Sequence, residues 1–159
     1  MKIRYRRILM GCRKLFAIVS QEDFDSLSVY GWSVTKTGYA KRTVSTKGRK
    51  VSVYMHREVC SAPSSMDVDH KNRNRLDNRR ENLRPCTRSQ NLANQPPRRG
   101  RYKGVCFSGR ENRWRATSQV DGKQVHIGYY DNAEDAAMAY DSVATRHFGE
   151  FAYLNFPNK

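Results

Sequence analysis

The stretch from residue 68 to residue 94 constrains this chain most, because it holds four polar residues whose types suit a single chemical site. Asp69 and His70 are adjacent, Asn82 follows His70 with eleven residues between, and Asn91 follows Asn82 with eight between. Oxygen ligands such as carboxylates and carboxamides suit Mg²⁺, and a neutral histidine beside them can take a proton from water near pH 7. These four side chains can therefore hold one divalent cation and one general base.

Positive charge surrounds this stretch and dominates the chain. Residues 66–100 hold nine Lys or Arg against four acids, and the whole sequence holds 30 against 15, for a net charge of +15. Such a balance says little about fold but predicts a polyanionic partner, with nucleic acid favoured over an anionic membrane. A cation and a base in a basic frame suit phosphodiester hydrolysis. No apolar run approaches the ~20 residues of a membrane span, so no membrane insertion is expected.

The N-terminus and the cysteines favour an intracellular protein. The first residues are basic and then apolar, as in a signal peptide, but Arg13 and Lys14 break the apolar part and no small-residue cleavage site follows. We therefore expect strand at the N-terminus and a cytoplasmic location. The cysteines form no C-x-x-C pair, which disfavours a structural zinc site and predicts reduced thiols. They are Cys12, Cys60, Cys86 and Cys106.

Three short sequence motifs in or before the polar stretch indicate a family. MHREV precedes it, and VDHKN and NRRENLR contain three of the four polar residues. With the spacing given above, these motifs resemble those of the HNH nuclease family, whose metal-binding segment folds as a ββα unit. The resemblance implies that Asp69 and Asn91 are ligands of one divalent ion, Mg²⁺ or alternatively Mn²⁺, and that His70 deprotonates the attacking water. It also implies that Asn82 orients His70 or its loop.

Arginines of the same loop can fork onto phosphate oxygens. We expect one of them to brace the scissile phosphate, with no preference among Arg75, Arg79, Arg80 and Arg84. His56 and Arg57 precede the motif, and in the resembling family such a pair begins a short helix packed against it. His56 is therefore either a phosphate or water contact near the site or a structural, hydrogen-bonded residue, and the sequence leaves both open.

The chain before the motif predicts an antiparallel frame. Two short strands within residues 3–20 precede a helix that begins after Ser20 and buries Phe24, Leu27 and Tyr30. Turn signals then separate β-branched segments, which predicts a meander of three strands. These strands are expected over residues 31–36, 39–45 and 50–56. Their lysines and arginines either contact phosphates or form a solvated basic face.

Charge and proline content change near residues 95–101, where the segment QPPRRGR predicts an extended linker. The chain before it is strongly basic, whereas residues 131–150 hold five acids against one arginine. We therefore expect two domains. The first is a nuclease domain over residues 1–97, with its metal motif at 66–95, and the second covers residues 98–159.

The second region shows the pattern of three strands and a helix. Residues 113–120 alternate in character, and Asp121-Gly122 predicts a hairpin turn into a strand over 124–130. A helix over 132–148 carries a stripe of alanines that would let it lie close on the sheet. Because the helix is acidic and the sheet is basic, we expect the free face of the sheet to meet DNA.

This region resembles the DNA-binding domain of plant ethylene-response factors, the APETALA-like domain. The resemblance lies in the motifs YKGV, GYYDNAEDAAMAYD and LNFP. The resemblance implies that the groove-facing positions are Lys103, Arg113, Arg115, Thr117, Gln119, Gln124 and His126. Plant members have arginines where this chain has Cys106, Ser108 and Gln119, and a tryptophan at His126. Because arginine to guanine is the commonest specific contact, their GC-rich target cannot be carried over. A folded spacer without a DNA role is the alternative for this region.

These patterns predict an α+β protein: a small ββα-metal HNH nuclease module with an N-terminal antiparallel meander, then a three-stranded antiparallel sheet packed on one helix. The expected function is a site-directed, homing-type endonuclease that nicks double-stranded DNA, of a kind found in phages and mobile elements. The alternatives are a non-catalytic DNA-binding regulator and an RNA-binding protein, although the sequence lacks the exposed aromatic pattern of common RNA modules. One Asp-His/Asn/Asn set predicts one cut per bound monomer, and either a monomer or a homodimer is compatible with the sequence.

Overall fold

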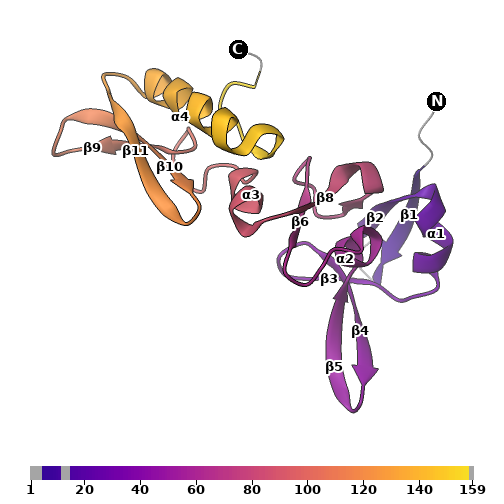
Figure 1. Ribbon diagram of the computed structural model, residues 1–159. Helices are drawn as coiled ribbons and strands as arrows, with labels where there is room; N and C mark the ends of the chain where they lie inside the picture. The colour runs from indigo at the N-terminus through magenta and orange to yellow at the C-terminus, as the bar shows by residue number, and fades with distance from the viewer. Residues whose placement is uncertain (1–4, 12–14, 158–159) are drawn as a thin grey trace. The chain divides into compact units, whose positions relative to one another are not determined.

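The computed structural model describes residues 5–11 and 15–157. The chain forms two compact units that divide after Cys86. Figure 1 shows small sheets and helices in each of them, so the predicted α+β class is confirmed. The ββα-metal arrangement as a whole stays a prediction. Residues 3–4 and 12–14 of the predicted N-terminal strands, with Cys12, lie outside the described residues.

Two antiparallel strands and a helix begin the first unit, as the sequence predicts. They are β1 (Tyr5–Met10), β2 (Leu15–Ser20) and α1 (Gln21–Ser28). Ser20 is the N-cap residue, and two acids in the first turn complement the helix dipole. Leu27 is buried and Phe24 packs against the same core. The predicted burial of Tyr30 was wrong, because this residue follows the end of α1 and is 42% exposed.

A third strand of this sheet was not predicted. β7 (Asp77–Asn78) runs parallel to β2 and completes the order β1-β2-β7. Aspartate and asparagine are disfavoured in strands, and two residues show no alternation, so the sequence carries no strand signal here. Both residues are nevertheless buried. The short strand ties the loop after the Asp-His pair to the N-terminal sheet.

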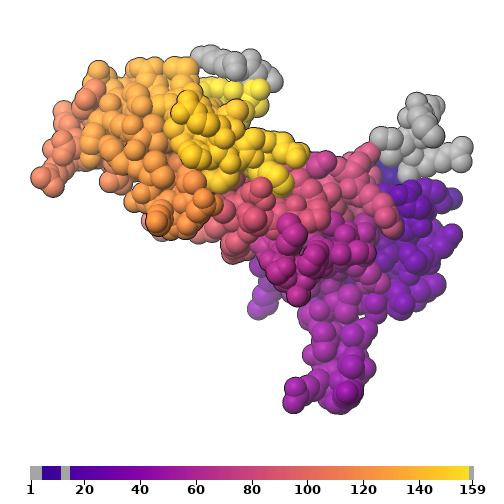
Figure 2. Space-filling model, viewed as in Figure 1, coloured from indigo at the N-terminus to yellow at the C-terminus, as the bar shows by residue number. Residues whose placement is uncertain are grey.

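The predicted meander is present, with its first and third strands shorter than expected and its second shifted by one residue. It consists of β3 (Ser33–Val34), β4 (Ala40–Thr46) and β5 (Arg49–Tyr54) in the order β3-β4-β5. Lys47 and Gly48 form the two-residue turn, with φ values of 50° and 74°, as a type I′ hairpin requires. Figure 1 and Figure 2 show the β4–β5 hairpin projecting from the rest of its unit. The strand predicted to reach residue 56 ends at Tyr54, because α2 (Met55–Cys60) begins there and buries Met55, His56 and Val59.

The segment that holds the Asp-His pair lies between α2 and the unit boundary. β6 (Asp67–His70) pairs antiparallel with β8 (Leu83–Cys86), and the 3₁₀ turn η2 (Arg80–Asn82) leads into β8. Val68 and Leu83 face the same hydrophobic core as residues of β1, β2 and α2. Trp32 closes this core and donates from its indole N–H to the carbonyl of Leu27 at 2.8 Å. The core therefore fixes the sheet from which Asp69 and His70 project.

The second unit has the predicted three strands and a helix. Its elements are α3 (Arg88–Ala93), β9 (Val105–Ser108), β10 (Arg113–Val120), β11 (Lys123–Tyr130), α4 (Ala133–Phe148) and η3 (Gly149–Phe151). The antiparallel sheet has the order β11-β10-β9, and α4 covers one of its faces (Figure 1). The predicted alanine stripe is buried at Ala136, Ala137 and Ala144. None of the helices in the described part of the chain is long and apolar enough to cross a membrane.

Helix α3 packs within the second unit. Ala93 belongs to the core formed by Tyr140, Ala144 and Phe148 of α4, and its carbonyl accepts the backbone N–H of Tyr153 at 2.9 Å. The compact units therefore divide before α3, whereas the sequence placed the domain boundary after residue 97. That boundary concerned the division between nuclease and DNA-binding parts, and in this functional sense it stays a prediction.

Gly104 is the glycine that the packing of the second unit requires. Its φ is +76°, and a Cβ at this position would lie 2.0 Å from the ring of Tyr140 and 2.6 Å from the carbonyl oxygen of Thr117. The backbone can approach α4 and β10 this closely only without a side chain. The carbonyl of Gly104 also accepts the N–H of Thr117 at 2.8 Å.

We expect Gly104→Ala to destabilise the second unit by about 2–4 kcal/mol, from overpacking against Tyr140 and the left-handed backbone. This corresponds to a drop in melting temperature of roughly 10 °C or more, measured by calorimetry. Gly109→Ala is the control, because nothing lies within 4 Å of its added Cβ and its φ is not in the left-handed region. Equal melting temperatures for the two variants would contradict the close approach at Gly104.

Candidate active site

Strand β6 presents Asp69 and His70 at its end, beside strand β8. The antiparallel register places Asp69 opposite Arg84 and His70 opposite Leu83. Both site residues are 4% exposed. A carboxylate and an imidazole buried next to one another need specific partners, and these partners define what the pair can do.

Arg84 binds Asp69 across the two strands. Its Nε and Nη2 donate to Oδ2 of Asp69 at 2.9 and 2.8 Å, and Arg84 is itself buried. The pair fixes the orientation of the carboxylate, and breaking it would leave an uncompensated buried charge. The sequence proposed Arg84 among the braces for the scissile phosphate, and the structure places its guanidinium against Asp69.

The other three arginines of the loop also have protein partners. Arg75 donates to the carbonyl of Thr37 at 2.5 Å and lies over the ring of Tyr39. Arg79 binds the carboxylate of Asp77 through Nε and Nη2 at 2.8 and 2.7 Å. Arg80 binds the buried carboxylate of Asp23, with its shortest contact at 2.6 Å. The choice of a phosphate brace among the four arginines stays a prediction.

Asn82 holds the loop that follows His70. Its side-chain oxygen accepts the backbone N–H of Asn72 at 3.0 Å, and its amide donates to the carbonyl of Asp77 at 2.7 Å. Its own carbonyl accepts the N–H of Lys71 at 2.9 Å. One buried carboxamide thus joins the beginning and the end of the loop. These contacts suit the predicted role of orienting the loop, and the effect of Asn82 on His70 stays a prediction.

Asp77 is a buried residue of this loop that the sequence did not single out. Besides Arg79, it accepts a hydrogen bond from the amide of Asn72 at 2.7 Å. Burial alone would raise the pKa of its carboxyl, but the hydrogen bonds from Arg79 and Asn72 outweigh burial and lower the pKa. Asp77 therefore stays ionised and fixes the loop. No signal in the sequence separates it from an ordinary turn aspartate.

His70 lies in an aromatic environment that keeps it neutral. Its ring centroid is 5.3 Å from that of His56 and 5.9 Å from that of Tyr39. Burial lowers the pKa of His70, and the polar side chain of Asn78 and the charge of Asp69 only partly oppose this. A neutral imidazole can accept a proton at neutral pH, which a general base must do.

His56 is buried in the same cluster, against the rings of Tyr39 and Tyr54. Burial, followed by the charges of His70 and Arg57, lowers the pKa of His56 to about 3. Its Nδ1 is buried without a hydrogen-bond partner among the described residues. Of the two roles left open by the sequence, the structure shows a packed, neutral histidine. Arg57 holds the next loop by donating to carbonyls, including that of Pro63 at 2.8 Å.

Asn91 lies on α3, in the second unit. A capping box begins this helix: Thr87 accepts the N–H of Gln90 at 3.2 Å, and the side chain of Gln90 accepts the N–H of Thr87 at 2.8 Å. The structure does not position this unit against the first, so the pairing of Asn91 with Asp69 around one ion stays a prediction. Among the described residues, no three His, Cys, Asp or Glu side chains gather to hold a metal. A carboxylate and a carboxamide, both hard oxygen donors, fit an ion that takes its other ligands from water and phosphate.

The face of the second sheet opposite α4 carries most of the predicted DNA contacts. Along β10, Ala116 and Ser118 are buried toward α4, which confirms the predicted alternation. The other face presents Arg113, Arg115, Thr117 and Gln119, with Gln124 and His126 paired to the last two from β11. Arg113 is bound to Asp131 at 2.9 Å. A bulge at Ile127 shifts the register, so that His126 lies against Tyr129, with 4.8 Å between ring centroids.

Lys103 differs from the other predicted contacts. Its Nζ donates to the carbonyls of Leu92, Ala93 and Gln95, at 3.1 Å to the first and 2.7 Å to the last. These carbonyls belong to the end of α3 and the residues after it. The structure therefore places Lys103 as the residue that satisfies the C-terminal end of α3.

Comparison with known proteins shows the family of the segment that holds the Asp-His pair. The model of the HNH endonuclease family matches residues 54–93, which include all four residues of the predicted site. An uncharacterized HNH endonuclease, L560, of Acanthamoeba polyphaga mimivirus is 34% identical over 157 residues, covering 95% of this chain and 80% of the viral protein. The chain belongs to the HNH endonuclease family.

Part of this HNH endonuclease is also similar to plant transcription factors. The AP2-like ethylene-responsive transcription factor At2g41710 of Arabidopsis thaliana is 34% identical over 89 residues, which are 46% of this chain. APETALA2-like protein 2 of Oryza sativa subsp. indica is 37% identical over 73 residues. The chain spans only 21% and 17% of these two relatives. No solved structure matches it.

We expect the HNH endonuclease to lose stability in acid partly through His56. The unfolded chain binds a proton at this residue below its ordinary pKa of 6.5, whereas the folded chain resists protonation down to about pH 3. The free energy of unfolding should therefore fall as the pH is lowered through this window, by up to about 1.4 kcal/mol per pH unit for one proton. In His56→Phe this contribution should vanish.

Urea unfolding of wild type and His56→Phe, from about pH 7 down to about pH 5, measures the difference in slope. His147→Phe is the control, because His147 is exposed on α4. If His56→Phe and wild type lose stability equally with falling pH, His56 is not buried as a neutral group.

Proposed function

We propose that this HNH endonuclease hydrolyses phosphodiester bonds in double-stranded DNA with a divalent metal, Mg²⁺ or alternatively Mn²⁺. The observation that carries the proposal is the buried Asp69–His70 pair within the family match, with burial lowering the pKa of His70. The similarity to transcription factors supports DNA as the partner. The site-directed, homing-type mode expected from the sequence belongs to the same proposal.

In this mechanism His70 accepts the proton of the attacking water. The hydroxide so formed attacks phosphorus, and the bond to the leaving oxygen breaks. Asp69 and Asn91 would hold the metal, which when bound stabilises negative charge on the phosphate and the leaving oxygen. The bonds from Arg84 fix Asp69 for this role, and Asn82 fixes the loop behind His70. Such supporting contacts keep a catalytic group in its productive geometry.

The plant-like similarity is proposed to lie in residues 98–159, as an ethylene-response-factor-type DNA-binding domain. The three-stranded sheet with one face free of α4 supports this assignment. Joining this domain to the nuclease part would raise overall affinity through effective concentration. A non-catalytic DNA-binding regulator would use the same sheet and would not cleave, so a cleavage assay decides between the two functions.

We expect His70→Ala to lower the rate of plasmid cleavage by roughly 10²–10⁴-fold, because the general base is removed. DNA affinity should stay near that of wild type, and chelation of the metal should stop cleavage by both proteins. His147→Ala, an exposed substitution on α4, is the control and should cut normally. His70→Gln, compared by melting temperature, separates lost catalysis from lost folding. Undiminished cleavage by a folded His70 variant would remove this residue from the role of base.

We also expect each bound monomer to nick one strand, since the chain holds one Asp-His/Asn/Asn set and one metal site addresses one phosphodiester at a time. A time course on supercoiled plasmid at low ratio of enzyme to DNA should show open circles accumulating before linear DNA. Linear product from the first time point, without open circles, would instead indicate two coupled sites in a dimer.

A further inference from the structure

The second unit contains a basic groove beside the sheet. It has a volume of about 770 Å³ and lies between the end of α3, the segment 95–99 and the sheet face opposite α4. The described residues that line it include five Lys or Arg and no acid. The five are Arg88, Arg98, Arg99, Lys103 and Arg115. In this chain such a concentration of one sign of charge favours an anionic occupant.

The segment that walls the groove is anchored at both ends. Gln95 is held at its carbonyl by Lys103 and at its N–H by the carbonyl of Leu92 at 3.2 Å. Tyr102 is buried and its hydroxyl donates to Glu134 at 2.9 Å. Between these anchors lie two prolines, which restrict the backbone. The sequence predicted an extended linker here; the contacts show a segment fixed to its unit at either end.

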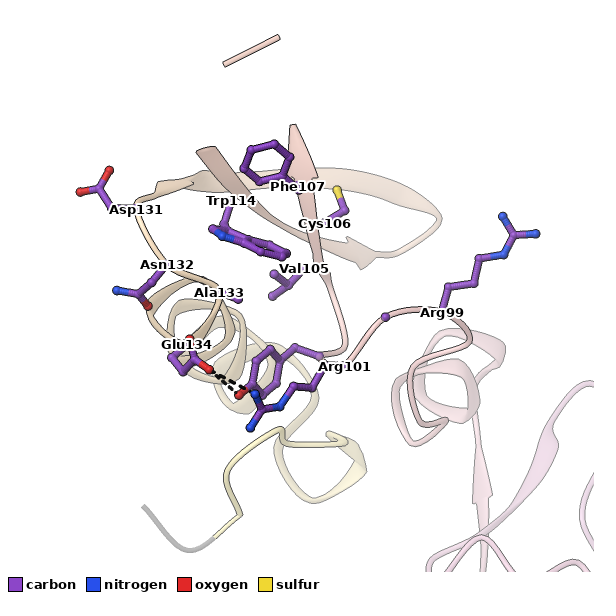
Figure 3. Close-up of a pocket in the computed structure, with 12 residues that line it drawn as sticks. Arg99, Arg101, Val105, Cys106, Phe107, Trp114, Asp131, Asn132, Ala133 and Glu134 are labelled. Atoms are coloured by element: carbon purple, nitrogen blue, oxygen red, sulfur yellow. Dashed lines mark hydrogen bonds and ion pairs between the residues drawn. The ribbon is translucent and has the colours of Figure 1, made fainter. Parts of the chain in front are cut away.

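Arg99 and Arg101, two residues apart in this segment, point in different directions. Figure 3 shows Arg101 directed toward Glu134, whereas Arg99 extends away from the pocket that contains Phe107 and Trp114. That pocket, of about 580 Å³, is lined by aromatic rings, by the acids Asp131 and Glu134 and by Arg99 and Arg101, so neither sign of charge dominates it. Arg98 and Arg99 are exposed on the segment and line the basic groove.

The floor of the groove is part of the proposed DNA-contact face. It includes Arg115, Thr117, Gln119 and Gln124. The Nε of Arg115 is buried without a hydrogen-bond partner among the described residues, while Nη2 lies 3.5 Å from the sulfur of Cys106. A buried donor without a partner costs free energy that a bound acceptor oxygen would recover.

We propose that Arg98 and Arg99 bind phosphates of the DNA backbone, and that the groove seats one strand of the duplex whose bases face β10 and β11. The inference rests on the proposed function as a DNA-cleaving enzyme. Phosphate contacts fix register and orientation, whereas contacts to base edges select sequence. The segment between the two parts of the chain is then a positioning element for DNA.

The test is the salt dependence of duplex binding by the full-length protein, with chelator present to prevent cleavage. Each lost phosphate contact lowers the slope of log affinity against log salt by about 0.9. Arg98→Gln/Arg99→Gln should therefore lower the slope by roughly 1.8 and weaken binding equally on duplexes of different sequence. The matched control is Arg110→Gln/Arg146→Gln, which removes two exposed charges outside the groove.

An unchanged slope, or an equal loss in the control variant, would overturn the proposal. So would a loss seen only with single-stranded DNA, because the groove would then not bind duplex. Melting temperatures of both variants should match that of wild type, since all four arginines are exposed. Plasmid cleavage by wild type tests the proposed nuclease function separately: normal cleavage with an unchanged slope in the variant rejects the groove alone.

Discussion

Buried carboxylates in a strongly basic chain organise this protein. A carboxylate removed from water needs a positive partner, because an isolated buried charge is too costly to keep. In the first unit Asp23, Asp69 and Asp77 each bind an arginine of the segment 79–84. These pairs connect α1, β6 and β7 to the chain that leads into β8. The Asp69–Arg84 pair joins β8 to β6, the strand that ends at His70, so the position of the proposed base depends on an ion pair formed by the predicted metal ligand itself.

The sequence predicted the elements that local patterns determine. The alternation of residues 113–120 and the Asp121-Gly122 turn each specify structure within a few residues, and both are confirmed. It did not predict the ion pairs between distant segments. Arg80 pairs with a residue 57 positions away, and an arginine that reaches a phosphate looks the same in sequence as one that reaches a carboxylate. β7 was missed for the same reason, since it is a strand only because β2 provides hydrogen bonds to it.

The helix that carries Asn91 belongs to the HNH match but packs in the second unit. The HNH match extends to residue 93, beyond the unit boundary after Cys86. Sequence motifs mark which residues share chemistry, whereas compact units mark which residues share a core, and at α3 these two divisions differ. Ala93 packs against α4, and Lys103 satisfies the carbonyls that end α3. The helix that carries Asn91, a proposed metal ligand, is therefore held in place by the unit whose sheet is proposed to contact DNA.

The partners of the arginines separate structural charge from charge that can attract DNA. Arg79, Arg80 and Arg84 already bind acids, and moving one of them to a phosphate would leave a buried carboxylate uncompensated. Arg98 and Arg99 line a groove whose described walls contain no acid, so a phosphate there would break no internal ion pair. Net charge alone does not distinguish these two groups. The free energy of replacing an existing partner distinguishes them, and it favours the proposed DNA contacts in the segment after α3 over contacts by the arginines of the loop after His70.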